Sequence, residues 1–272
     1  LLFSKTLPMI FSGKTCWVTG AASGMGKAVS IGLAQKGAKV IISDRDPKGL
    51  EECAQIIKNA GGLCRTEVLD MSNNKSITEI ANKVLADGEQ VWGLYQFAGI
   101  SQRSLVVDTP IENDRKIMEI NFFGVVTLCK ALLPHMIANG GGQLAATSSI
   151  VGKFGFPFRS AYSSSKHALH GFFECLLAEN SKNNIKVSML IPGRVQTNIS
   201  KFALNSDGSE YGKMDPGQAN GISSQKAAKI IIKGLEKQKK EILIGGKELI
   251  MLHIRRFLPS LYYHLATRIK PM

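Results

Sequence analysis

The chain has 272 residues, of which 44% are hydrophobic and 20% are charged, as in ordinary globular proteins, and one large α/β domain is the expected organisation. The formal net charge is +13, but no recognition motif accompanies it, so we do not expect a nucleic-acid partner. The five cysteines lack regular spacing and the five histidines form no ligand-spaced cluster, which argues against a disulfide framework and a metal site and favours core thiols.

The first predicted unit is a strand, a glycine-rich turn and a helix. The strand covers Thr15–Thr19, the turn at 20–26 reads GAASGMG, and the helix covers residues 27–36 before Gly37. Such a turn brings backbone N–H groups and a helix N-terminus close to a pyrophosphate, and glycines leave room for that approach. The pattern therefore predicts a dinucleotide site. The alternative is a tight turn with no functional role.

The second predicted strand, at residues 39–43, is followed by an acidic and then a basic residue. Asp44 lies 18 residues after Gly26, a separation at which a carboxylate accepts hydrogen bonds from the adenosine ribose and repels a 2′-phosphate. Arg45 instead suits a 2′-phosphate. Asp44 thus favours NAD, and Arg45 keeps NADP as the alternative. Asp44 is also compatible with a helix N-cap ahead of Pro47.

Strands and helices then alternate to the end of the predicted domain. Helices are expected at 48–60, 74–86, 111–137 (with its pattern interrupted at Asn121 and Gly124), 160–180 and 223–237, and strands at 63–69, 91–97, 143–147, 185–191 and 241–244, with 198–221 left without assigned structure. This alternation predicts a Rossmann-type, doubly wound parallel sheet in a single domain. Since the strands are parallel, the polar and glycine-rich segments that follow them meet at one edge, where ligands bind.

The stretch at 148–166 carries a pattern for proton transfer. Ser149 lies thirteen residues before Tyr162, and Lys166 lies four residues after it, so Tyr162 and Lys166 project from one helix face. A nearby ammonium lowers the pKa of a phenol from its usual value of about 10, and the phenol then serves as a general acid or base. The pattern predicts reduction of a carbonyl or oxidation of an alcohol. Taken alone, it also fits an exposed helical pair.

Aromatic residues surround this stretch. Phe154, Phe156 and Phe158 lie between Ser149 and Tyr162, and the apolar residues 202–204 begin the segment after Thr197. We expect an apolar pocket under a mobile segment, and hence a small hydrophobic carbonyl or alcohol substrate. The alternative is that some rings pack on the core or on a subunit interface.

The C-terminal region is basic and apolar. Eleven of the 34 basic residues but only three of the 21 acidic residues lie from 223 to 272, and Pro259 breaks any helix there. The tail at 247–272 is expected either to pack on the domain or a neighbouring subunit, or to rest on an anionic membrane surface.

Residues 1–10 are treated as an N-terminal extension and 11–246 as the domain. No run reaches the ~18 apolar residues of a membrane span, so the expected location is cytoplasmic with optional membrane association.

Taken together, these motifs resemble the short-chain dehydrogenase/reductase family, in particular its single-domain subgroup. The resemblance covers residues 11–246 and consists of TGxxxGxG at 19–26, Asp70, Ala98-Gly99, Asn121, Ser149, Tyr162-x-x-x-Lys166 and PGxVxT at 192–197. Residues 100–103 and 162–172 are most similar to a branch that includes dehydrogenase/reductase member 7-like proteins and, more distantly, 11β-hydroxysteroid dehydrogenases. That branch implies membrane association, lipid-like or steroid-like carbonyl substrates and, in many members, NADP.

The resemblance implies a role for each matched residue. Tyr162 is implied to be the general acid/base, Lys166 to lower its pKa and hold the nicotinamide ribose, Ser149 to orient the substrate oxygen, and Asn121 to anchor a water in a proton relay. The residues expected at the cofactor are Gly20, Ser23, Gly24, Met25, Gly26, Asp44, Arg45, Asp70, Met71, Ala98, Gly99, Tyr162, Lys166, Pro192, Gly193, Val195 and Thr197. Those expected at the substrate are Ser149, Tyr162 and Phe156. A homodimer or homotetramer is usual in the family.

One segment departs from the family pattern. After the fourth strand the family usually has Asn-Asn-Ala-Gly, whereas this chain has Gln96-Phe97-Ala98-Gly99. The change bears on how the strand end packs and how the adenosine ribose is held. The sequence thus predicts an NAD(P)-dependent oxidoreductase, with a cofactor-retaining epimerase or dehydratase, or a catalytically silent nucleotide-binding regulator, as alternatives.

Overall fold

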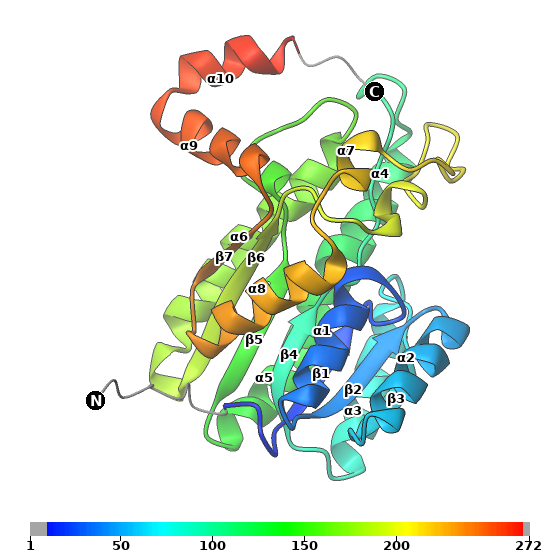
Figure 1. The fold of residues 1–272 in the computed structure, drawn as a ribbon, viewed down its shortest axis with the longest axis vertical. Helices are drawn as coiled ribbons and strands as arrows, with labels where there is room; N and C mark the ends of the chain where they lie inside the picture. Colours follow the sequence, from blue (N-terminus) through cyan, green and yellow to red (C-terminus); the bar gives the residue numbers. More distant parts are fainter. Residues whose placement is uncertain (1–9, 269–272) are drawn as a thin grey trace.

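The computed structural model describes residues 10–268, so most of the predicted N-terminal extension (1–9) and the end of the tail (269–272) lie outside the described residues. Seven parallel strands form one sheet in the order β3-β2-β1-β4-β5-β6-β7 (Figure 1). The strands are β1 (Thr15–Thr19), β2 (Lys39–Asp44), β3 (Cys64–Val68), β4 (Val91–Gln96), β5 (Gly142–Thr147), β6 (Ile185–Pro192) and β7 (Glu241–Ile244). The predicted doubly wound parallel sheet is confirmed.

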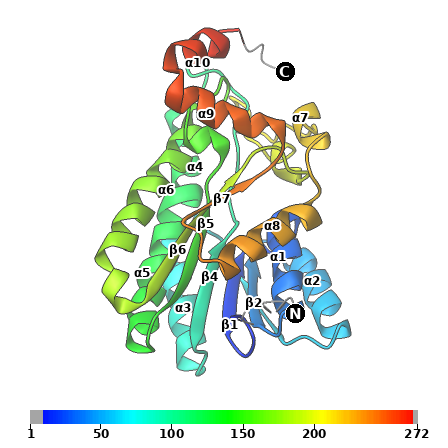
Figure 2. The same cartoon turned by 60° about the vertical axis from the view of Figure 1, so that its left-hand side comes forward.

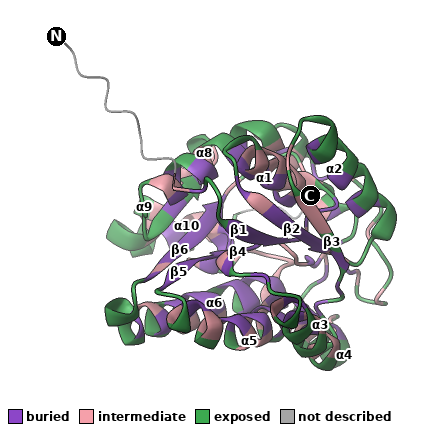
Figure 3. Cartoon of the chain, turned by 90° about the horizontal axis from the view of Figure 1, so that it is seen from below, coloured by how far each residue is buried: buried purple, intermediate pink, exposed green. Residues whose placement is uncertain are grey.

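Helices cover both faces of this sheet (Figure 3). One face carries α1 (Gly24–Gln35), α2 (Pro47–Asn59) and α8 (Ser224–Glu236), and the other carries α3 (Asn74–Ala86), α4 (Ile111–Met118), α5 (Gly124–Ala138) and α6 (Ser160–Glu179). The chain runs outward from β1 to β3 and then returns to place β4 on the other side of β1. The strand order therefore reverses next to β1, which is the point where ligands bind in such sheets.

The two faces of the core follow from the side-chain alternation of the buried strands. In β1, Cys16 and Val18 pack toward α1 and α8, whereas Trp17 between them packs in the core on the opposite face. All three side chains are fully buried, and the Trp17 indole donates a hydrogen bond to Ser43 Oγ at 2.9 Å. Since parallel strands are covered on both faces, both alternating sets are apolar.

The predicted helix over residues 111–137 forms, but a π-helical turn interrupts it. The turn, Glu119–Phe123, joins α4 to α5 and contains the buried Asn121. Directly after it, a Cβ atom on Gly124 would lie 2.2 Å from the backbone oxygen of Met71, so only glycine allows this approach. The sequence-pattern interruptions at Asn121 and Gly124 therefore mark where the helix changes its winding.

By length and composition alone, the continuous helical stretch Ile111–Ala138 is long and apolar enough to cross a membrane. In this fold, however, one side of the stretch packs on the sheet. Leu128, Leu132 and Met136 are fully buried in the core cluster on that face. The apolar character is thus also that of a core helix.

The segment after β6, to which the sequence assigned no structure, contains helical turns, and the tail forms two helices. Residues 198–221 form a 3₁₀ turn, Asn198–Ser200, and the short helix α7 (Pro216–Ala219). The tail forms α9 (Ile250–Phe257) and α10 (Pro259–Ala266), beyond the end of the sheet at the top of Figure 2. Pro259 occupies the first turn of α10, where no intrahelical N–H is required, so the expected break falls there.

Candidate active site

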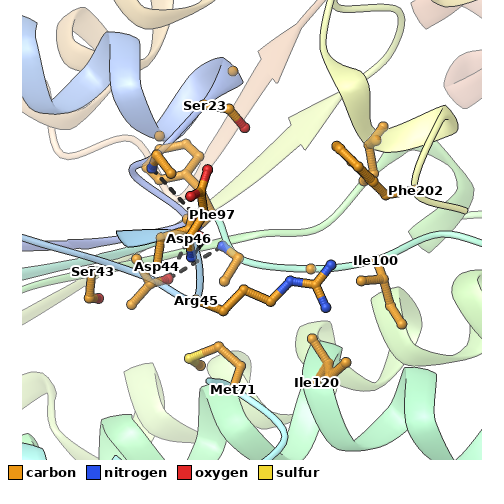
Figure 4. A pocket seen from close by; sticks show the side chains of 18 of the residues that line it. Ser23, Ser43, Asp44, Arg45, Asp46, Met71, Phe97, Ile100, Ile120 and Phe202 are labelled. Atoms are coloured by element: carbon orange, nitrogen blue, oxygen red, sulfur yellow. Dashed lines mark hydrogen bonds between the residues drawn. The ribbon is translucent and has the colours of Figure 1, made fainter. Parts of the chain in front are cut away.

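A pocket of about 460 Å³, here called the glycine-lined pocket, lies at the carboxyl ends of the central strands (Figure 4). It is lined by twelve of the residues expected at the cofactor: Gly20, Ser23, Gly24, Met25, Gly26, Asp44, Arg45, Asp70, Met71, Ala98, Gly99 and Thr197. Pro192, Gly193 and Val195 line a second, neighbouring cavity instead. The structure therefore brings together at the strand ends residues that are far apart in the sequence.

The glycines of the first turn are required by close backbone contacts. Gly20 has a φ of +68°, and a Cβ atom there would lie 2.6 Å from the backbone nitrogen of Ala98. A Cβ atom on Gly26 would lie 2.1 Å from the Gly20 carbonyl oxygen. Ser23, at the N-cap of α1, makes no side-chain capping bond to the first turn. The backbone N–H groups of the first turn of α1 therefore remain available for a phosphate, so this turn fits a dinucleotide.

Asp44 and Arg45 both line this pocket, and Figure 4 shows the Arg45 side chain extending into it. Asp44 Oδ2 accepts a bond from the Ala22 backbone N–H at 3.2 Å, and Oδ1 accepts one from the Asp46 backbone at 3.1 Å. Asp46, not Asp44, caps α2 by accepting from the Lys48 backbone. The capping explanation for Asp44 was therefore wrong, because the chain needs two further residues before the helix begins.

The unusual Gln96-Phe97 pair points in two directions. Gln96 is buried, and its amide nitrogen donates to the Val125 carbonyl at 3.3 Å and to Cys129 Sγ at 3.1 Å, on the α5 side. Its amide oxygen has no hydrogen-bond partner among the described residues. Phe97 lines the glycine-lined pocket, and its backbone N–H donates to Thr19 Oγ1. The substitution therefore presents an aromatic ring, and not an amide, to a ligand.

Ser149, Tyr162 and Lys166 line the second cavity, here called the Ser149–Tyr162 cavity, which has a volume of about 330 Å³. It shares Met25, Phe97, Gly99, Thr197 and Ile199 with the first pocket, so the two adjoin. Ser149 follows β5 and caps a 3₁₀ turn, accepting from the Val151 backbone at 3.3 Å. Tyr162 and Lys166 come from the first turns of α6 and are buried.

Lys166 is held by the end of a strand. Its ammonium nitrogen donates to the Thr147 carbonyl at 2.7 Å and lies 5.7 Å from the centre of the Tyr162 ring. The buried Asn121 amide bridges the Ile100 backbone, donating to its carbonyl and accepting from its N–H, both at 2.9 Å, and it also donates to Ser165 Oγ. A Cβ atom on Gly99 would lie 2.9 Å from Asn121 Oδ1 and 3.4 Å from Lys166 Nζ, so Gly99 lies close to both groups.

Burial has the largest effect on the pKa of both Tyr162 and Lys166. It raises the pKa of Tyr162 above its ordinary value, and the charge of Arg159, the hydrogen bond with Ser149 and the charge of Arg103 lower that pKa in part. Burial also lowers the pKa of Lys166 to about 7. The sequence-based expectation assigned the lowering of the Tyr162 pKa to Lys166. In the structure burial instead raises the Tyr162 pKa overall, and the partial lowering comes from Arg159, Ser149 and Arg103.

The aromatic residues do not all lie where they were expected. Phe154 and Phe156 line the Ser149–Tyr162 cavity, whereas Phe158 lines a separate surface pocket and Phe202 lines the glycine-lined pocket. Leu204 is buried and exchanges backbone hydrogen bonds with residues 101–103, at 2.8 and 2.9 Å. This part of the predicted mobile segment is therefore tied to the loop after β4.

Sequence reasoning missed several residues that line the cavity. Arg103, Arg159 and Asp215 converge on it from three separate segments, and Glu248 and Met251 reach it from the tail. Glu248 accepts bonds from the backbone of Arg194 and of Gly246, which ties the tail to the segment after β6. The one available signal was Arg159, three residues before Tyr162 and hence on the same face of the helix start.

Comparison with known proteins agrees with this geometry. The family model for short chain dehydrogenase matches residues 14–207. The chain is 40% identical over 253 residues to dehydrogenase/reductase SDR family member 7B of Mus musculus, covering 91% of this chain and 78% of that protein. It is also 36% identical over 271 residues to an SDR family protein 7-like of Drosophila melanogaster, covering 98% of this chain and 82% of that protein.

Solved structures share the fold. A short-chain dehydrogenase from Streptomyces avermitilis is 28% identical with a TM-score of 0.79, covering 93% of this chain and 96% of its own. A short-chain dehydrogenase/reductase from Burkholderia phymatum in complex with NAD is 21% identical with a TM-score of 0.81, covering 96% of this chain and 97% of its own. A metagenomic short-chain oxidoreductase in complex with NADP has a TM-score of 0.72 at 24% identity, covering 86% and 97%.

Proposed function

Because the chain belongs to the short-chain dehydrogenase/reductase family, we propose that it uses a nicotinamide cofactor to interconvert a carbonyl and a secondary alcohol. One observation carries this proposal: the buried side chains of Ser149, Tyr162 and Lys166 line a cavity that adjoins the glycine-lined pocket. The reacting groups are thus shielded from water beside the place for a dinucleotide. When bound, the nicotinamide supplies or accepts the hydride.

In the proposed mechanism Tyr162 handles the proton. In the reducing direction its hydroxyl gives a proton to the carbonyl oxygen as that oxygen gains negative charge, and Ser149 donates a hydrogen bond to the same oxygen. The positive charge of Arg159 stabilises the phenolate that forms, and Lys166 adds to this where it is protonated. A proton from solvent then restores the phenol, by way of Lys166 and a water anchored near Asn121. Oxidation of an alcohol reverses each step.

Cofactor choice is proposed to be NAD, with NADP as the alternative. Asp44 has two backbone hydrogen bonds, and a carboxylate has lone pairs left for ribose hydroxyls. Its negative charge disfavours a 2′-phosphate. Arg45 next to it is exposed and supports the alternative. The remaining cofactor roles proposed for Asp70, Met71, Val195 and Thr197 follow the family pattern.

We propose a largely apolar substrate. The cavity wall includes the apolar residues Val151, Phe154, Phe156, Ile199 and Met251. Phe154 also packs on Tyr262 of α10, with ring centroids 5.4 Å apart, so the tail forms part of this wall. Neither a cofactor-retaining epimerase or dehydratase nor a silent regulator is favoured by the family match.

The tail is further proposed to rest on an anionic membrane surface, with the rest of the protein in the cytoplasm. Phe257, Leu258 and Tyr263 are 69%, 55% and 58% exposed, beside Arg255 and Arg256. Apolar rings flanked by arginines suit an interfacial helix. Phe257→Ser should then reduce co-sedimentation with phosphatidylserine vesicles, whereas Leu63→Ser, an exposed residue before β3, should not. Equal vesicle binding by both variants would remove the proposal.

A homodimer or homotetramer is proposed on the family pattern, with α5 and α6 as the contact. Phe123, at the end of the π-helical turn directly before α5, is 46% exposed. The solution mass from light scattering tests this directly. A monomer at micromolar concentration would contradict it.

Tyr162→Phe tests the proposed reaction, because it keeps the ring and removes the hydroxyl whose proton the mechanism transfers to the carbonyl oxygen. Turnover of hydrophobic ketones should fall at least about 100-fold, the lower end of the contribution usual for general acid catalysis, while reduced cofactor still binds. Tyr263→Phe, at an exposed tyrosine of α10, is the matched control and should keep its turnover. Undiminished turnover by Tyr162→Phe would exclude the proposed role.

A further inference from the structure

Two arginines that line the Ser149–Tyr162 cavity bind the same carboxylate. Arg103, in the loop after β4, and Arg159, at the start of α6, donate to Asp215 Oδ2 at 3.1 and 2.8 Å. Asp215 Oδ1 already accepts the Gly217 backbone N–H at 2.8 Å. The three side chains are 8%, 22% and 10% exposed. This arginine–aspartate cluster therefore keeps one positive charge in excess within a largely buried site.

The donors of the two arginines are not used equally. Arg103 also donates to Ser101 Oγ at 3.2 Å and to the Gln102 carbonyl at 2.7 Å. The Arg159 side chain makes one hydrogen bond within residues 10–268, the one to Asp215, and its guanidinium stacks over the Phe156 ring at 5.1 Å. A guanidinium has five N–H donors in a planar fork that matches an oxyanion. Arg159 thus has donors left over, and it lines the cavity.

The other charged groups of the cavity do not neutralise this excess. Glu248 brings one negative charge, held by the backbone N–H groups of Arg194 and Gly246 at 2.7 and 3.0 Å, and the positive charge of the exposed Arg194 offsets it. Burial and the like charge of Arg103 together lower the pKa of Arg159. An uncompensated buried charge is costly, and a bound anion removes that cost.

We propose that Arg159, assisted by Arg103, binds an anionic group, a carboxylate or a phosphate, on the carbonyl substrate. The apolar remainder of that substrate lies against Phe156, Ile199 and Met251, which line the same cavity. Since Arg159 precedes Tyr162 by about one helical turn, the anion would be held close to the reacting carbonyl. The substrate class is then an amphipathic carbonyl compound with an anionic group near the carbonyl. This inference rests on the proposed function.

Binding of unreactive probes tests the anion site without any turnover. Decyl phosphate, decanoate and decanol are titrated into the full chain at fixed salt by calorimetry. We expect at least one anion to bind about 10- to 100-fold more tightly than the alcohol, as charge-assisted hydrogen bonds predict, and the two anions distinguish phosphate from carboxylate. Equal affinities for all three probes would overturn the proposal.

Substitutions locate the effect. Arg159→Gln should reduce the anion-to-alcohol affinity ratio at least about tenfold, while Arg115→Gln removes the same charge from an exposed site on α4 and should leave the ratio unchanged. If Arg159→Gln does not fold, Arg159→Lys replaces it in the same titration, since lysine keeps the positive charge but lacks the planar set of donors of a guanidinium. An unchanged ratio in the Arg159 variant would contradict the assignment.

Turnover separates this proposal from the function on which it rests. A keto acid and its methyl ester are compared as substrates of the wild-type chain. Faster reduction of the acid supports both, whereas reduction of the ester with no preference for the acid removes the anion site and leaves the oxidoreductase standing. Anion binding that depends on Arg159, with no reduction of either compound, retains the anion site and removes the proposed function.

Discussion

Gly124 gives the most direct test of how the fold shapes the cofactor pocket. It begins α5 directly after the π-helical turn, and a Cβ atom there would lie 2.2 Å from the Met71 backbone oxygen and 3.1 Å from its carbonyl carbon. Because both atoms are backbone, no side-chain rotation relieves the clash. Gly124→Ala must therefore separate α5 from the segment after β3.

The expected cost follows from overpacking in a close-packed interior, about 1–3 kcal/mol of the free energy of unfolding. For a chain of this size that corresponds to a fall in Tm of roughly 2–10 °C. Since Met71 lines the glycine-lined pocket, the same displacement should also weaken the binding of reduced cofactor. Thermal melting with and without cofactor measures both effects.

Gly171 provides the matched control. It lies inside α6, and a Cβ atom there would meet nothing within 4 Å. Gly171→Ala should therefore be neutral or stabilising, by up to about 1 kcal/mol, because alanine has the higher helix propensity. The reasoning is refuted if Gly124→Ala melts and binds cofactor like the wild type, or if both variants lose equal stability at the same oligomeric state.

Two further predictions concern charge. Asp44→Asn should move cofactor preference toward NADPH, and Arg45→Gln should move it toward NADH, as measured by nicotinamide fluorescence titration; opposite shifts would assign the selecting role to other residues. Burial lowers the pKa of His170 to about 4 from 6.5, so this neutral imidazole contributes stability that is complete above pH 6.5 and is lost as the pH falls toward 4. Urea denaturation should show a steeper loss over that window for the wild type than for His170→Gln, and parallel curves would contradict the assignment.

The sequence predicted what depends on local pattern. Alternating strands and helices, the turn ending in Gly26 and the spacing of Tyr162 and Lys166 were enough to predict the parallel sheet and the ligand edge, and the observed strands lie within two residues of their predicted ends. Asn121 and Gly124 were visible as interruptions, although the π-helical turn between them was not. These features are set by neighbours in the chain.

What depends on burial and distant contacts was not predictable. Helical spacing suggested that Lys166 lowers the pKa of Tyr162, but spacing does not reveal that both groups are buried, and burial shifts each pKa toward the neutral form. The arginine–aspartate cluster joins residues 112 and 56 positions apart. No sequence period links such residues, so only the folded chain shows them together.

The central claim is that this chain transfers a hydride with net change of its cofactor. Incubation with reduced nicotinamide cofactor deuterated at C4 and an apolar ketone, with the products analysed by mass spectrometry, tests it most directly. The account predicts one oxidised cofactor for each alcohol formed, with deuterium on the carbinol carbon. A product isomer or dehydrated product formed with no net oxidation of cofactor would contradict it and favour a cofactor-retaining epimerase or dehydratase.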